Sequence, residues 1–218
     1  MLRWTQLCSE LGVASRLAHA EGKRLIGSWD RLPRYYHDTT HLLACLKGLD
    51  KVRALLKDPP AAALALWFHD AVYWPRRHDN EDRSAVWAAE FMTRAGLPMA
   101  LRDLVVRHIL ETKHSALPSP GDAQTVIDID LGVLGQNEAV YAGFERNVRK
   151  EYRWVPWPDY AMRRSAVLQS FLDRARIYST DWFFERHEAT ARHNLERTIK
   201  DLSRSLEIAD TTRHQTKL

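Results

Sequence analysis

The residues with the clearest chemical potential are a histidine and an aspartate that stand side by side. His69 and Asp70 follow directly on an apolar run over residues 61–68. Burying a carboxylate beside an imidazole costs free energy unless a partner compensates for it. Further histidines and aspartates that could join them upstream and downstream are His37, His41, Asp128 and Asp130. A divalent metal ion, or a pair of such ions, is one partner that accounts for this many His and Asp residues.

Other histidines could extend this set, and each also has a structural explanation. His37 precedes His41 by four residues, so the two would share one face if both lay on a helix. His108 and His114 lie between the His-Asp doublet and Asp130. A single buried histidine is more often hydrogen-bonded than bound to metal, and an aspartate can instead cap a helix. We therefore treat these histidines as accessory candidates.

The cysteines and the apolar runs bear on the cellular compartment. Cys45 follows His41 by four residues and could be a ligand, although a small buried side chain is the more common role. With Cys8 as the only other cysteine, there is no disulfide framework, and we expect free thiols in a reducing compartment. No run approaches the roughly 18 apolar residues of a membrane span, and residues 1–10 lack a signal-peptide pattern. We expect a cytoplasmic protein with no membrane partner.

The elements that must position these residues all have a helical pattern. Apolar residues recur at helical spacing along nearly the whole chain, and no segment resembles a β-hairpin. Proline, glycine and capping residues divide the pattern. We expect helices over residues 4–17, 40–56, 61–72, 80–95, 98–110, 122–130, 137–152, 159–178 and 181–208. The prediction is one all-α domain over residues 1–218, with a metal-binding core at about 34–135 and a C-terminal helical extension at about 137–208.

The charge of the chain restricts its partners only weakly. The formal net charge is +4, which fits an anionic substrate and also fits weak association with nucleic acid. Basic residues gather over residues 146–164, but Glu145, Glu151 and Asp159 are interleaved with them. This mixture is more typical of a solvated helical face than of a binding stripe. We therefore do not expect nucleic acid to be a partner, while a homo-oligomer is compatible with the sequence.

The His and Asp residues recur in a fixed order, and further motifs surround them. The segments concerned are Arg34-Tyr35-Tyr36-His37, His41-Leu42, Trp67-Phe68-His69-Asp70-Ala71-Val72-Tyr73, Asp79-Asn80-Glu81, Arg83-Ser84-Ala85, Ile109, Thr112-Lys113-His114, Asp128-Ile129-Asp130-Leu131-Gly132, Glu151-Tyr152, Arg164, Glu188, Ala191-Arg192 and Asn194-Leu195. Through them the chain resembles the HD superfamily of metal-dependent phosphohydrolases, and more narrowly the bacterial group of predicted metal-dependent HD phosphohydrolases. The doublet alone is a weak signal, whereas the ordered set is specific.

This resemblance implies a ligand set and a reaction. It makes His41 the first metal ligand, His69 and Asp70 the doublet, and Asp130 the last ligand, in preference to Asp128. Members with two metals have additional histidines between the doublet and the last Asp, where His108 and His114 lie. One metal ion is our expectation. His and carboxylate ligands suit Mn, Fe, Ni, Co, Zn or Mg and do not choose among them.

The expected reaction is the attack of a metal-activated water on phosphorus. Asp70 could both bind the metal and orient this water, and Glu81 is the candidate general acid or base. Glu81 could instead interact with the dipole of its own helix, in whose first turn it lies. Ser84, three residues later, would face the same way. Arginine and lysine side chains that could neutralise phosphate, each of which could also be a structural or surface charge, are Arg34, Arg83, Lys113 and Arg164.

Three interpretations therefore remain open. The first, which we prefer, is a metal-dependent phosphohydrolase acting on a nucleotide or another small phosphate ester. The second is a di-iron oxygenase of the HD type, which would require His108 or His114 as ligands of a second metal. The third is a non-catalytic module whose metal is structural and whose basic surface binds nucleic acid or another partner. The complete set of His41, His69, Asp70 and Asp130 argues against the third.

Overall fold

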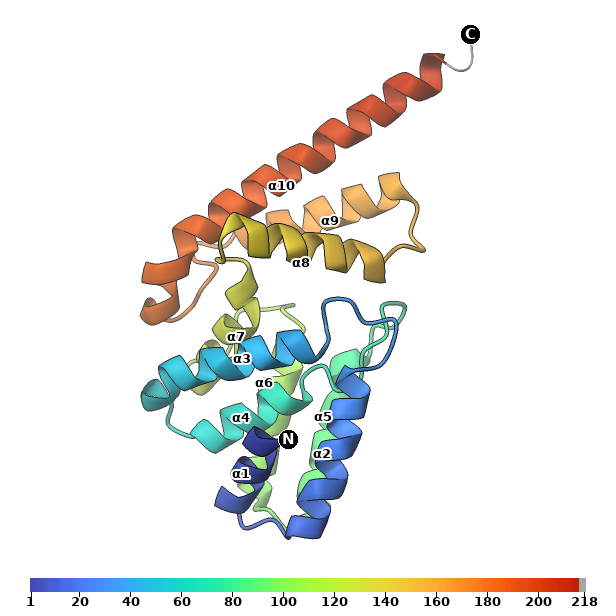
Figure 1. Ribbon diagram of the computed structural model, residues 1–218. Helices are drawn as coiled ribbons and strands as arrows, with labels where there is room; N and C mark the ends of the chain where they lie inside the picture. Colours follow the sequence, from blue (N-terminus) through green and yellow to red (C-terminus); the bar gives the residue numbers. More distant parts are fainter. Residues whose placement is uncertain (216–218) are drawn as a thin grey trace. The chain divides into compact units, whose positions relative to one another are not determined.

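The computed structural model describes the backbone of residues 1–215 and the side chains of residues 1–207. Within these residues the protein is all-α and contains no β-strand, as the sequence pattern predicts. The chain forms two compact units, residues 1–130 and the residues from Leu131 onward (Figure 1). The unit boundary lies close to the expected end of the core near residue 135. The expectation of a single domain stays a prediction.

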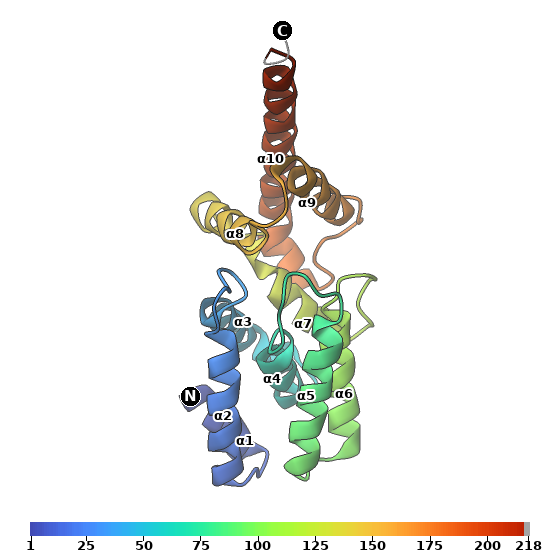
Figure 2. The same ribbon diagram turned by 90° about the vertical axis from the view of Figure 1, so that its right-hand side faces the viewer.

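Seven α-helices make up the first unit. They are α1 (Leu2–Glu10), α2 (Ser15–Trp29), α3 (Thr39–Val52), α4 (Pro59–Phe68), α5 (Asn80–Arg94), α6 (Met99–Glu111) and α7 (Asp122–Asp130). A short 3₁₀ turn, Arg53–Leu55, follows α3. Helices α5 and α6 lie side by side in both views (Figures 1 and 2). The helix that organises the unit is α4, because α3, α5, α6 and α7 all pack against it.

Helix α4 is buried on every side, which explains its composition. Each residue from Ala61 to Phe68 is buried, and a helix that is apolar all round is stable only in the interior. Asp58 caps its start, because a carboxylate oxygen accepts a hydrogen bond from the backbone N–H of Ala61 at 2.9 Å. The two following prolines occupy the first turn, where their missing N–H groups cost nothing. The expected helix over residues 61–72 is therefore wrong at both ends, and His69 and Asp70 lie just beyond its C-terminus.

The N-terminal region differs more from the expectation. The single helix predicted over residues 4–17 is wrong, because the chain forms α1, a turn and the longer α2 instead. Gly12 lies in this turn with φ +71, a conformation that favours glycine. Trp4 joins the two helices, since its indole N–H donates to the carbonyl of Ala18 at 2.7 Å. The turn lets both helices bury an apolar face in the same core.

The second unit contains α8 (Glu138–Glu151), α9 (Trp157–Leu172) and α10 (Asp181–Gln215), after a 3₁₀ turn at Leu131–Val133. Helices α9 and α10 pack against each other. The segment between them is held by the buried Glu188, which accepts hydrogen bonds from the backbone N–H groups of Ile177 and Tyr178. The predicted helix over residues 159–178 is therefore wrong at its end, because α9 ends at Leu172. Helix α10 extends beyond the predicted residue 208. Among the described residues, no helix combines the length and apolar character that crossing a membrane requires.

Candidate metal centre

Four of the sequence-predicted ligands converge inside the first unit from three different elements. His41 lies in the first turn of α3, His69 and Asp70 follow the end of α4, and Asp130 ends α7. The start of α3 is set by Asp38, whose carboxylate accepts hydrogen bonds from the backbone N–H groups of Thr40 and His41. All four side chains are largely buried. We call these four residues the HHDD cluster.

The donor atoms of the HHDD cluster lie at distances typical of ligands of one metal ion. The Nε2 atoms of His41 and His69 are 3.2 Å apart, and they lie 3.0 and 3.4 Å from Oδ1 of Asp130. Asp70 Oδ2 lies 3.2 Å from His69 Nε2 and 4.0 Å from His41 Nε2. Two ligands at about 2.1 Å from one ion are separated by about 3.0 to 3.4 Å when they are neighbours in octahedral or tetrahedral coordination. The residues present therefore fit a divalent cation.

The electrostatics of the cluster also favour a cation. Burial by itself would lower the pKa of His69, but Asp70 and Asp130 raise it well above its usual value. Burial likewise opposes ionisation of Asp70, yet His69 holds the pKa of this carboxyl well below its usual range. The pKa of Asp130 is also low, against the effect of burial, because of His69 and hydrogen bonds from His114 and His41. Two buried carboxylates that stay ionised require a positive charge between them, which the protonated His69 supplies here and which a divalent cation could supply in its place.

Residues around the cluster orient two of its members. Nδ1 of His69 lies 3.0 Å from the carbonyl oxygen of Leu66, and because a carbonyl only accepts, Nδ1 carries the proton. In the neutral ring this leaves the lone pair of Nε2 facing the cluster, which is the usual arrangement for a metal-binding histidine. Nε2 of His114 likewise lies 3.0 Å from Oδ2 of Asp130. His114 thus directs Oδ1 of Asp130 towards the cluster.

Arg34 is a positioning residue of the cluster. Its guanidinium donates to the carbonyl oxygens of His37 at 3.0 Å, Asp70 at 2.7 Å and Ala71 at 3.0 Å. It is buried, and it lies over the ring of Trp29. Arg34 therefore ties the segment before α3 to the segment after α4, instead of presenting its donors to a phosphate.

The start of α5 brings Glu81 into electrostatic reach of the cluster. Ser84 holds the segment after Asp70, because its Oγ accepts from the backbone N–H of Val72 at 3.0 Å. Asn80 pairs with both backbone groups of Trp74. Burial raises the pKa of Glu81, and the charge of Asp70 raises it further. The structure thus places Glu81 where its proton responds to the charge on the cluster.

The predicted phosphate-binding cations have different surroundings. Lys113 pairs with Asp82 at 2.7 Å, and Arg83 pairs with Asp79 at 2.8 Å, both in exposed positions around the start of α5. Arg164 lies in the second unit, where it forms a buried ion pair with Glu145 at 2.6 Å. Lys113 and Arg83 are therefore the cations that share the region of Glu81.

The remaining histidine candidates lie outside the HHDD cluster. The ring of His37 stacks on Tyr73 at a centroid distance of 4.1 Å and lies 5.9 Å from that of His41. His108 is buried on α6, and neither ring nitrogen has a hydrogen-bond partner among the described residues. Burial lowers the pKa of His108, which favours a neutral ring. Asp128, the less favoured aspartate, is fully buried and does not belong to the group of potential ligands.

Cys45, which the sequence favours as a buried side chain over a ligand, is a neighbour of the cluster. Its Sγ lies 3.7 Å from Nε2 of His41, and it forms a compact group of potential ligands with His41, His69 and Asp130. The spacing of four residues from His41 was the available signal, because it puts both residues on one face of α3. Burial, followed by the charges of Asp130 and Asp70, raises the pKa of this thiol well above its usual value.

We expect Cys45→Ser to retain bound metal and its stoichiometry, because the two histidines and two carboxylates of the cluster already provide four donors. Metal analysis of the purified variant beside wild type provides the measurement. The native protein should also react slowly with a thiol reagent, because burial raises the pKa of Cys8 to about 12 as well. Loss of the metal in Cys45→Ser would show that the sulfur of Cys45 belongs to the ligand set.

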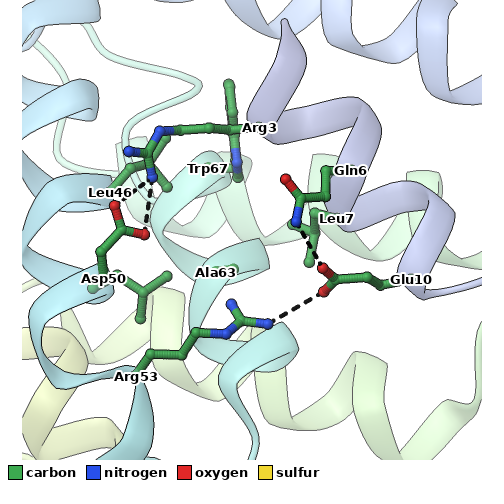
Figure 3. A pocket seen from close by; sticks show the side chains of 10 residues that line it. Arg3, Gln6, Leu7, Glu10, Leu46, Asp50, Arg53, Ala63 and Trp67 are labelled. Atoms are coloured by element: carbon green, nitrogen blue, oxygen red, sulfur yellow. Dashed lines mark hydrogen bonds and ion pairs between the residues drawn. The ribbon is translucent and has the colours of Figure 1, made fainter.

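A separate pocket lies between α1, α3 and α4, on a different set of residues (Figure 3). Leu7, Leu46 and Trp67 contribute to its apolar lining. Its charged residues neutralise one another, through ion pairs of Arg3 with Asp50 at 2.7 Å and of Arg53 with Glu10 at 3.2 Å. These paired charges leave no net charge to attract a phosphate, so the pocket does not compete with the HHDD cluster as the reactive site.

His41, His69 and Asp130 thus form, with Cys45, a compact group that could hold a metal ion, and Asp70 lies beside this group with its Oδ2 3.2 Å from Nε2 of His69. No protein-family model, curated protein or solved structure matches the chain. The relation to the HD superfamily therefore stays a prediction that depends on the residues themselves.

Proposed function

We propose that the protein is a metal-dependent phosphohydrolase that acts on a nucleotide or another small phosphate ester. The observation that carries this proposal is the convergence of His41, His69, Asp70 and Asp130 at ligand-like distances. Two imidazoles and two carboxylates suit Mn, Fe, Ni, Co, Zn or Mg. Because a mixed set of nitrogen and oxygen ligands does not select one of these metals, the identity of the metal has to be measured.

The proposed roles of the residues follow from their positions. A bound divalent cation supplies charge stabilisation at a phosphoryl oxygen and lowers the pKa of a water molecule. Asp70 orients that water through its second carboxylate oxygen. Glu81 gives its proton to the leaving oxygen, because its raised pKa keeps more of it protonated near neutral pH. Lys113 and Arg83 can exchange their exposed carboxylate partners for phosphate oxygens, since exposed ion pairs contribute only about 0–1 kcal/mol.

The test combines metal analysis of the purified protein with phosphate release from a panel of nucleotides and small phosphate esters. We expect about one divalent ion per chain and metal-dependent phosphate release from at least one member of the panel. Two irons per chain without phosphate release would favour the oxygenase. Absence of bound metal after supplementation with each of the candidate ions would contradict both the phosphohydrolase and the oxygenase.

Glu81→Gln should lower kcat by about 10²- to 10⁴-fold, because it removes the proposed proton donor. A general acid works only while protonated, so wild-type activity should fall as the pH rises through the raised pKa of Glu81. The variant should lose this descending limb of the pH–rate profile and keep its metal. A profile that is unchanged in shape would contradict the role. Glu90→Gln, an exposed position on the same helix, is the matched control.

A further inference from the structure

Helices α8 and α9 of the second unit are joined by a turn (Figure 1). Basic and aromatic residues gather in the sequence around this turn. Arg146, Lys150 and Arg153 recur at helical spacing and are exposed. Trp154 and Trp157 follow them with 45% and 38% of their surface exposed. Two further exposed residues, Met162 and Arg163, lie in the first turns of α9. We call these seven residues the corner surface.

Two of the three acidic residues that are interleaved with these cations in the sequence are largely buried. Glu145 pairs with Arg164 and accepts a hydrogen bond from Tyr141, and both of its partners are largely buried. Glu151 is only 4% exposed. Of the three acids counted in the sequence analysis, only Asp159 remains exposed. The interleaved sequence therefore folds into a surface with a clear excess of positive charge.

The arginines of the corner surface are available to an external anion. Arg146, Arg153 and Arg163 form no ion pair with any side chain that the structure describes. Arginine binds phosphate oxygens through two parallel N–H groups, which makes it a good partner for a nucleic-acid backbone. Arg146 and Lys150 lie one turn apart on α8, and Arg153 follows in the turn after this helix. Each cation that neutralises a phosphate releases counterions and so strengthens binding.

Trp157 is held in place by contacts with its neighbours. The indole N–H of Trp157 donates to Ser205 Oγ at 3.2 Å, and Arg149 lies over its ring at 5.5 Å. Arg149 also donates to the carbonyl oxygens of Tyr152 at 2.6 Å and Val155 at 3.1 Å, which fixes the turn. An indole fixed in this way offers a ring surface for stacking, whereas membrane insertion requires apolar side chains that project beyond the surface.

We propose that the corner surface binds single-stranded nucleic acid, with its arginines on phosphates and its tryptophans stacked on bases. Unpaired bases expose the ring faces that such stacking needs, and a positive track beside aromatic rings is the usual design of single-strand binding sites. In a duplex the faces of the bases are stacked on one another and cannot contact the tryptophans. An acidic peptide would pair with the arginines but has no ring that would stack on the indoles. This proposal does not depend on the metal centre or on the proposed hydrolysis.

The test measures fluorescence anisotropy of a labelled oligouridylate of about 20 nucleotides with the full chain, in the absence of added metal. We expect the logarithm of the association constant to fall with the logarithm of salt concentration with a slope of about −2, for three phosphate contacts. The triple variant Arg146→Glu/Lys150→Glu/Arg153→Glu should abolish this binding. Trp154→Ala should weaken it by about 5- to 100-fold with an unchanged salt slope.

The matched control is Arg16→Glu/Lys47→Glu/Lys51→Glu, which reverses three exposed charges on α2 and α3 and changes the net charge equally. It should bind the oligonucleotide as wild type does, and far-ultraviolet circular dichroism should show that both triple variants keep their helices. An equal loss of oligonucleotide affinity in both triple variants would show that binding depends only on net charge, and it would overturn the proposal. Binding to phosphatidylserine-containing vesicles, with none to the oligonucleotide, would overturn it in favour of a lipid surface.

Discussion

Combining His69→Ala with Asp70→Ala is expected to remove bound metal from the purified protein and to lower phosphate release by at least about 10³-fold. The doublet supplies two of the four donors, and both lie beside the remaining pair, with His69 Nε2 3.2 Å from His41 Nε2 and 3.4 Å from Asp130 Oδ1. A set reduced to His41 and Asp130 cannot enclose an ion. Metal content and initial rates on the best substrate of the panel provide the measurements.

A thermal readout separates loss of metal from loss of fold. A ligand that binds only the native state adds about 2.7 kcal/mol at a hundred times its Kd, so added metal should raise the melting temperature of wild type but not that of the double variant. His193→Ala/Asp201→Ala removes an exposed His and Asp from α10 and is the matched control. Retention of stoichiometric metal by the doublet variant would contradict the assigned centre.

Gly22→Ala is expected to destabilise the protein by about 1–3 kcal/mol, as overpacking in a core usually does. A Cβ at this position would lie 2.5 Å from Cδ1 of Trp4 and 2.9 Å from its Nε1. Trp4 cannot yield easily, because it is fully buried and its ring lies 5.3 Å from those of Trp67 and Phe91. Its hydrogen bond to Ala18 would also be lost with any shift. Chemical denaturation gives the free energy of unfolding.

A glycine-to-alanine substitution at another position of α2 should stabilise the protein instead of destabilising it. A Cβ at Gly27 would meet nothing within 4 Å, so Gly27→Ala keeps only the benefit of alanine in a helix, about 0.5–1 kcal/mol. Comparing the free energies of unfolding of Gly22→Ala and Gly27→Ala therefore distinguishes the effect of crowding against Trp4 from that of helix propensity. Equal effects at the two positions would show that Trp4 does not pack against α2 as described.

Local patterns allowed most of the fold to be predicted. The helical spacing of apolar residues located nearly every helix, and breakers such as Asp58 with its two prolines marked a boundary, although the role of Asp58 as the cap of α4 was missed. The division into α1 and α2 was also missed, because the apolar spacing continues across residues 10–15 and only Gly12 signals the turn. Spacing shows which residues can share a face, and it does not show where the chain reverses.

For the candidate site, the sequence indicated the possible ligands but not the partners of the surrounding charged residues. The order of His41, His69, Asp70 and Asp130 along the chain was readable, and the structure brings the four together. The partners of charged residues were not readable, because they depend on contacts between distant segments. The donors of Arg34 go to backbone carbonyls 36 and 37 residues away. For the same reason, the sequence did not indicate that the side chains of Glu145 and Glu151 are largely buried.

The position of Asp130 as the last residue of the first unit has a consequence for biosynthesis. His41, His69 and Asp70 are translated well before it, yet the donor set stays incomplete until residue 130 has left the ribosome. Domains fold as units during synthesis, and metal binding is coupled to folding. Under the proposed function, the ion could be enclosed only when the first unit is complete, so a chain that terminates before residue 130 would lack one of the four proposed donors.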